Sequence, residues 1–145
     1  MSLENWLADK LIEIHHPSAH ETKRLLAICD RDLEKCCIPG LGPDWKLSIA
    51  YNAALTAAMA ALSAAGYRAR KDGQHYRVIQ SLAYTIKAKP LLITTLDKFR
   101  QKRNISDYEM AGMITEAEAE AMLTLAKNLR NAVEEWLKKN HPELL

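Results

Sequence analysis

Residues 102–112, KRNISDYEMAG, place four polar side chains at helical spacing: Arg103, Asn104, Asp107 and Tyr108. A guanidinium is a fixed fork of donors that can grip two oxygens of a phosphate. An amide and a phenol beside it could donate further hydrogen bonds to the same group. If the segment is one helix, Arg103 and Asp107 share a face, and so do Asn104 and Tyr108. The types and spacing of these residues therefore predict that the segment recognises a phosphate.

A structural interpretation of the same residues is also open. The preceding apolar residues Leu92, Leu96 and Phe99 recur at helical spacing, so Arg103 would continue a stripe that points inward. A buried arginine is costly unless it is paired, and Asp107 is placed one turn away to pair with it. The two residues would then form an ion pair that fastens this helix to its neighbours.

The net charge of +2 is unevenly distributed, because residues 66–104 hold ten Lys/Arg against two Asp/Glu. A basic stretch of this density predicts a phosphate-bearing partner such as RNA. The rings of Tyr67, His75 and Tyr76 are available for stacking on bases. The alternative is the solvated face of ordinary helices. The candidate RNA-contacting side chains are Arg68, Arg70, Lys71, Arg77 and Lys102.

The helices that must position these residues are predicted to begin at capping motifs in the sequence. Ser18 and Glu21 have the spacing of a capping box that opens one helix, and Thr115 and Glu118 open the last helix in the same way. The last helix also has acidic residues at its start and two lysines at its end, as the helix dipole favours.

The middle of the chain predicts three further helix segments. Asp44 is expected to cap a helix over residues 45–65, which Gly66 terminates. A third helix is expected from about residue 73 to Ile86. Pro90 ends that helix and occupies the first turn of the fourth, where its missing N–H is tolerated.

Nine of the sixteen residues from 50 to 65 are alanine, so this segment is predicted to be the central helix, which its neighbours approach closely. Tyr51 and Asn52 stand out in it. Asn52 is predicted to make a hydrogen bond to a neighbouring helix, and the alternative is that it joins the polar site.

The composition favours helix over sheet, because alanine and leucine dominate and glycine and proline number five each. At 145 residues the chain is most simply one domain. The predicted fold is all-α, an antiparallel up-and-down bundle of four to five helices. It is expected to comprise a short N-terminal helical extension over residues 1–17, the bundle over 18–140 and a tail over 141–145.

Several classes of function are not expected. No apolar run approaches the roughly 20 residues that cross a bilayer, and the acidic residues near the N-terminus argue against a secretory signal. Three cysteines without a CxxC pair favour a reducing compartment, so the expected location is cytoplasmic. No metal site is predicted, because Pro17 interrupts the histidines of HHPSAH. No cofactor is predicted, because no glycine-rich phosphate loop is present.

The polar motif resembles the signature of the HEPN superfamily, small helical bundles with an arginine, a polar residue and usually a histidine about five positions on. Arg103 and Asn104 match the opening, and RNISDY is similar to the R-x-x-A-D-Y variant of one prokaryotic branch. AYNAALTAAMAAL, GQHYRVI and TEAEAEAMLTLAKNLRNAVEEWL resemble the second, third and last helices of that branch. The resemblance covers roughly residues 18–137.

The resemblance implies a homodimer that contacts RNA. Many members of the family are metal-independent ribonucleases, often toxins of toxin–antitoxin pairs, in which arginine and histidine from two subunits meet. By resemblance the candidate catalytic residues are Arg103, Asn104 and Tyr108. Tyr108 stands in the place of the histidine, however, and a phenol with a pKa of about 10 is a poor base at neutral pH. His75 lies on another helix and could approach in space.

Two functional hypotheses follow. The first is a dimeric bundle that binds or cleaves RNA through Arg103. The second, motivated by the missing histidine, is a non-catalytic interaction module that dimerises or binds a minimal nucleotidyltransferase, the partner protein that the family suggests. Replacing Arg103 with alanine separates them: the first predicts a loss of RNA binding, and the second predicts a lower melting temperature.

Overall fold

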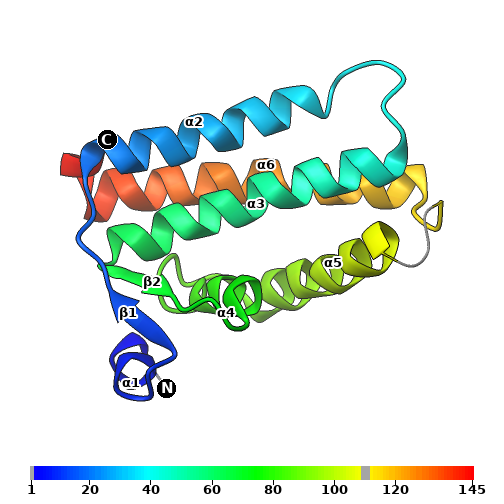
Figure 1. Cartoon of the computed structure of the whole chain (residues 1–145). Helices are drawn as coiled ribbons and strands as arrows, with labels where there is room; N and C mark the ends of the chain where they lie inside the picture. The colour runs from blue at the N-terminus through cyan, green and yellow to red at the C-terminus, as the bar shows by residue number, and fades with distance from the viewer. Residues whose placement is uncertain (1, 109–111) are drawn as a thin grey trace.

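The computed structural model describes residues 2–108 and 112–145, with the backbone alone at 105–108. The chain is mostly helical, and its elements pack around one hydrophobic core (Figure 1). In chain order they are α1 (Leu3–Ala8), β1 (Ile12–Ile14), α2 (Ala19–Lys35), α3 (Pro43–Ala64), β2 (Tyr67–Ala69), α4 (Gln74–Ser81), α5 (Pro90–Tyr108), α6 (Glu116–Asn140) and the 3₁₀ turn η1 (Pro142–Leu144).

Helix α3 is the central element, in contact with α2, α4, α5 and α6 (Figure 1). Fourteen of its 22 residues are buried, and most of these are alanine, whose small side chain lets neighbouring helices approach closely. The helix is long and apolar enough to cross a membrane, so the expectation that no run approaches this length was wrong. Within the protein 78% of this apolar stretch is buried, which accounts for the same composition.

The predicted capping box is complete at the start of α6, but only its serine half forms at the start of α2. In α6 both halves of the capping box form, because Thr115 Oγ1 accepts from the Glu118 amide at 3.1 Å and Glu118 accepts from the Thr115 amide at 3.1 Å. In α2, Ser18 Oγ accepts from the Glu21 amide at 3.1 Å. The Glu21 carboxylate does not complete the box, because it binds His15 and Ser63 instead.

The prediction that Asp44 caps α3 was wrong. The helix begins at Pro43, with Gly42 as its N-cap, so Asp44 already lies in the first turn. Its carboxylate accepts a hydrogen bond from the Gly112 amide at 2.7 Å. Asp44 therefore connects the start of α3 to the chain segment before α6. Gly66 follows the end of the helix with a φ of +98°, as its expected terminating role requires.

Helix α4 is shorter than predicted. It ends at Ser81, whereas the sequence predicted a helix that continues to Ile86. From Leu82 to Tyr84 each amide donates to the carbonyl three residues earlier, which tightens the chain into turns. The hydroxyl of Ser81 also donates to the Val78 carbonyl at 2.6 Å. Such back-bonding competes with continued α-helix and gives a physical reason for the early end. Pro90 does open α5, as predicted.

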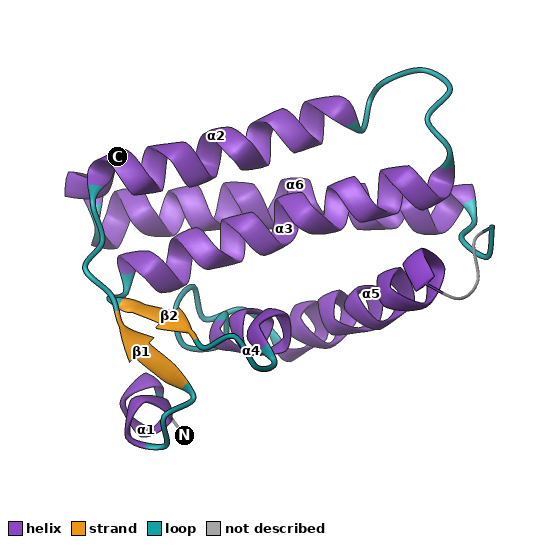
Figure 2. Cartoon of the chain, in the orientation of Figure 1, coloured by secondary structure: helices purple, strands orange, loops and turns teal. Residues whose placement is uncertain are grey.

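The N-terminal segment is only partly helical. Residues 3–8 form α1, but residues 12–14 form β1, which pairs antiparallel with β2 in the register Ile12↔Ala69 and Ile14↔Tyr67 (Figure 2). Trp6 is buried and meets Tyr84 edge-to-face, with ring centroids 5.1 Å apart. The segment therefore adds side chains to the same core as the helices.

Candidate phosphate-binding site

Arg103 lies on α5 with its guanidinium against the ring of Tyr51 from α3. Its guanidinium carbon is 5.5 Å from the ring centroid, within the range of a cation–π contact. Tyr51 is only 1% exposed, so its ring is a fixed platform beneath the half-buried arginine. The prediction that Arg103 continues an inward stripe agrees with this position.

His75, at the start of α4, lies beside the same platform. Its ring centroid is 6.3 Å from that of Tyr51, so packing brings it near Arg103, although the two residues lie on different helices. Partial burial lowers the pKa of His75 below its usual value, and the positive charges of Arg103 and Arg100 lower it further. The imidazole therefore favours its neutral form.

Two further arginines extend this group. Arg100, one turn before Arg103, donates from Nε to Asp97 at 2.7 Å and lies 5.6 Å from the ring centroid of Tyr76. Arg77 lies 5.7 Å from the same ring, and its buried Nε has no hydrogen-bond partner among the described residues. Tyr76 is 41% exposed, so solvent reaches this surface. We call the group the arginine–aromatic cluster; it comprises Tyr51, His75, Tyr76, Arg77, Arg100 and Arg103.

The other members of the polar motif contribute less to the described site. Asn104 is exposed on α5. The backbone of Asp107 and Tyr108 belongs to α5, but their side chains lie outside the described residues, and with them the predicted pair of Arg103 and Asp107. The Tyr51 hydroxyl is buried without a hydrogen-bond partner in the described part of the chain, and burial raises its pKa to about 12, so it stays protonated.

The predicted RNA-contacting residues separate into different surfaces. Only Arg77 joins the arginine–aromatic cluster. Arg68 and Arg70 lie against Glu13 of β1, with N–O distances of 2.9 and 3.9 Å, and line a pocket of about 510 Å³ together with Lys71. Lys102 forms an ion pair with Glu118 of α6 and so fastens α5 to α6.

Sequence reasoning missed Arg100 as a site residue and treated Tyr51 only as an anomaly in an alanine-rich helix. The available signals were the position of Arg100 one turn before Arg103 and the large polar ring of Tyr51 among small side chains. The predicted role of Asn52 is confirmed, because its amide donates to Asp32 of α2 at 2.8 Å.

The described residues outside the arginine–aromatic cluster offer little for metal binding or for catalysis by a thiol. Within residues 2–108 and 112–145, no three His, Cys, Asp or Glu side chains gather closely enough to hold a metal ion. Burial raises the pKa of Cys29 to about 12 and that of Cys36 to about 11, so both thiols stay protonated and are poor nucleophiles.

The chain matches no protein-family model, no curated protein and no solved structure. The chemistry of the arginine–aromatic cluster is therefore the basis on which a function can be argued.

Proposed function

We propose that this protein is a HEPN-type helical bundle that contacts RNA phosphates at the arginine–aromatic cluster. The observation that carries the proposal is the guanidinium of Arg103 held against buried Tyr51, with His75 beside the same ring. A guanidinium held against an aromatic ring is restricted in its orientation, and its fork of N–H donors suits a phosphate. The exposed Tyr76 ring offers a surface on which a base can stack.

The proposal includes an antiparallel up-and-down order of the helices, a homodimer and a cytoplasmic location in a prokaryotic cell, within a toxin–antitoxin pair. Sedimentation of the purified chain at micromolar concentration tests the dimer. A species of twice the 16.4 kDa chain mass is expected, and a monomer at all concentrations would oppose this part of the proposal.

Binding of a short single-stranded RNA, measured by fluorescence anisotropy, tests the contact. We expect Arg103→Ala to raise the Kd by about tenfold, the loss of one charge-assisted contact. Arg103→Lys keeps the charge but loses the planar fork, so an intermediate Kd is expected. Equal Kd values for all three proteins, each folded by circular dichroism, would reject the proposed contact.

Cleavage of RNA is a second candidate activity, favoured by the approach of His75 to Arg103. A neutral imidazole could accept the proton of a 2′-hydroxyl as that oxygen bonds to the adjacent phosphorus. The bond from phosphorus to the 5′-oxygen then breaks, and the proton passes to that leaving oxygen. Arg103 would stabilise the negative charge on the phosphoryl oxygens during the step.

The cleavage proposal is tested with His75→Gln. RNA affinity is expected to change little, while the cleavage rate falls by about 10²-fold or more, the usual contribution of a general base. Cleavage at the wild-type rate would remove His75 from the reaction, and an absence of cleavage in both proteins would leave RNA contact as the function.

The alternative proposal is a non-catalytic module that binds a nucleotidyltransferase-type protein. One observation favours it: Trp45 and Met113 are 69% and 57% exposed, and the neighbouring Asp44 and Gly112 are hydrogen-bonded to each other. Exposed large apolar side chains at one end of a bundle suit a protein partner. In this case Arg103→Ala would lower the melting temperature without changing RNA binding, and Trp45→Ala would weaken the complex.

A further inference from the structure

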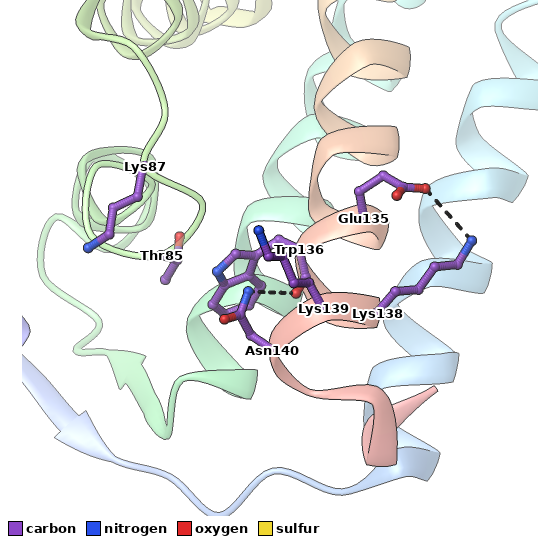
Figure 3. A pocket seen from close by; sticks show the side chains of 7 residues that line it. All are labelled: Thr85, Lys87, Glu135, Trp136, Lys138, Lys139 and Asn140. Atoms are coloured by element: carbon purple, nitrogen blue, oxygen red, sulfur yellow. Dashed lines mark hydrogen bonds and ion pairs between the residues drawn. The ribbon is translucent and has the colours of Figure 1, made fainter.

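A second basic site lies away from the arginine–aromatic cluster, between the turn that follows α4 and the C-terminal end of α6. It is a groove of about 590 Å³, within the size range of small-molecule sites. Figure 3 shows Thr85 and Lys87 on one wall and Trp136, Lys139 and Asn140 on the other. We call it the Trp136 groove.

Two of its three lysines, Lys87 and Lys139, form no ion pair with the described residues, and the groove's own carboxylate, Glu135, lies against Lys138. Lys138 lies 3.9 Å from Glu134 and 3.8 Å from Glu135, and Figure 3 shows it extending toward Glu135, away from Thr85 and Lys87. Lys139 has no ion pair among the described residues, and Lys87 donates only to the Tyr84 carbonyl, at 3.3 Å. The groove is therefore electropositive where Lys87 and Lys139 approach it.

Trp136 supplies a flat aromatic wall. The indole is half-buried, and its centroid lies 4.9 Å from the ring of His141, which supports it from one side. Asn140 donates to the Trp136 carbonyl at 3.1 Å and so ties down the end of α6. An indole braced in this way is a platform on which a planar ring can stack with little loss of side-chain freedom.

The opposite wall is held in an uncommon backbone conformation. Lys87 has a φ of +56°, a region that side-chain-bearing residues rarely adopt, and the next amide, that of Ala88, donates to the Leu82 carbonyl at 3.0 Å. Such conformations persist where the surrounding structure fixes them, and they concentrate at binding sites. The turn thus holds the Lys87 side chain on the wall opposite Trp136.

We propose that the Trp136 groove binds a nucleotide, with its base on Trp136 and its phosphate between Lys87 and Lys139. The pairing of one aromatic platform with two lysines that form no ion pair with the described residues matches the pairing of a planar base with an anionic phosphate in one molecule. The nucleotide is either free in solution or part of an RNA strand. The site shares no residue with the arginine–aromatic cluster, so it is independent of the RNA contact proposed above.

The experiment follows the indole N–H signals of the full chain by two-dimensional NMR. The sequence has three tryptophans, and Trp136→Phe assigns the relevant signal. Adenosine monophosphate, adenosine, inorganic phosphate and a short RNA are titrated separately. The Trp136 signal is expected to move saturably with the nucleotide, with a Kd below about 1 mM. Weaker responses are expected from adenosine and from phosphate alone, because each supplies half of the contacts.

Two neighbouring lysines provide a matched comparison. Lys139→Ala is expected to weaken nucleotide binding by about fivefold or more, the loss of one direct charge contact, whereas Lys138→Ala, already paired with glutamates, changes it by less than about twofold. A saturable shift with RNA alone would assign the site to a strand, and a shift with the mononucleotide would assign it to a free nucleotide as well.

The proposal is overturned by any of three results: no saturable shift with nucleotide or RNA, equal effects of the two lysine variants, or an equal shift with adenosine alone. Arg103→Ala separates this site from the proposed RNA contact. The nucleotide shift at Trp136 should persist in that variant, and its disappearance would show that the groove is not an independent site.

Discussion

At the scale of single residues, Tyr51 organises the candidate site. The buried side chains around it on α3 are mostly alanine, so its ring provides the large surface against which Arg103 and His75 rest. Its hydroxyl, by contrast, finds no hydrogen-bond partner in the described part of the chain. The ring and the hydroxyl should therefore contribute very differently to the stability of the protein.

Two substitutions at position 51 separate these contributions. Tyr51→Phe keeps the ring and removes a buried, unpaired hydroxyl, so the free energy of unfolding is expected to change by less than about 1 kcal/mol. Tyr51→Ala removes the ring from the core and is expected to cost about 3–5 kcal/mol. Urea unfolding measures both. A loss in the phenylalanine variant as large as that in the alanine variant would show that the hydroxyl is bonded after all.

The same residues show how far a sequence can define a site. The helical spacing placed Arg103 on an inward stripe, and its position against Tyr51 agrees with that prediction. His75 and Tyr51 reach it through the packing of α4 and α3, which are separated from α5 in the chain, and no local pattern encodes such an approach. Sequence spacing specifies neighbours within one helix, whereas contacts between helices depend on the assembled core.

At the scale of elements, Glu21 connects three segments. Its carboxylate lies 2.8 Å from His15 Nε2, just after β1, and it accepts a hydrogen bond from Ser63 near the end of α3. Burial alone would raise the pKa of Glu21, but the hydrogen bonds from Ser63 and His15, with the charges of His15 and Arg24, outweigh burial and lower it. The folded protein thus prefers the ionised carboxylate.

Glu21→Gln is expected to lower the free energy of unfolding by about 1–3 kcal/mol at neutral pH. Because the folded-state pKa is depressed, the stabilisation is present above about pH 4.5 and is lost as the pH falls through the folded value. The difference between wild type and variant should therefore shrink in acid. Urea titrations at several pH values measure it, with Glu34→Gln, an exposed glutamate on the same helix, as the control. A difference independent of pH would contradict the role of the carboxylate charge.

The connection from α3 to β2 depends on Gly66. Its φ of +98° is unfavourable for any residue with a Cβ, although the nearest atom to an added Cβ, the His15 carbonyl oxygen, is at an ordinary 3.8 Å. Gly66→Ala is expected to destabilise the protein by about 1–3 kcal/mol through backbone strain. Gly42→Ala is the matched control, since Gly42 has a φ of −68° and open space around it. Equal melting temperatures for the two variants would contradict this account.

Most elements were predictable from local signals, and the exceptions have a common cause. The caps at Ser18 and Thr115 and the proline at position 90 mark helix starts that the structure confirms. The strands β1 and β2 are three residues long and pair across more than fifty positions, so neither segment carries a recognisable pattern. The early end of α4 likewise reflects local hydroxyl bonding that competes with an otherwise helical pattern.

At the scale of the whole molecule, folding redistributes the charge of the basic block. Residues 66–104 carry ten Lys/Arg, but Glu13 on β1 lies against Arg68 and Arg70, and Glu118 on α6 pairs with Lys102. Asp97 similarly pairs with Arg100. The cationic surface available to a phosphate is thus smaller than the sequence suggests.

The central claim is that Arg103 contacts an RNA phosphate, and the salt dependence of RNA affinity tests it most directly. Each phosphate contact on a single strand contributes about 0.7 to the slope of log affinity against log salt concentration. Arg103→Ala is predicted to make that slope shallower by about 0.7, whereas Arg24→Ala, which removes an exposed arginine from α2, leaves it unchanged. Identical slopes for wild type and Arg103→Ala would contradict the claim.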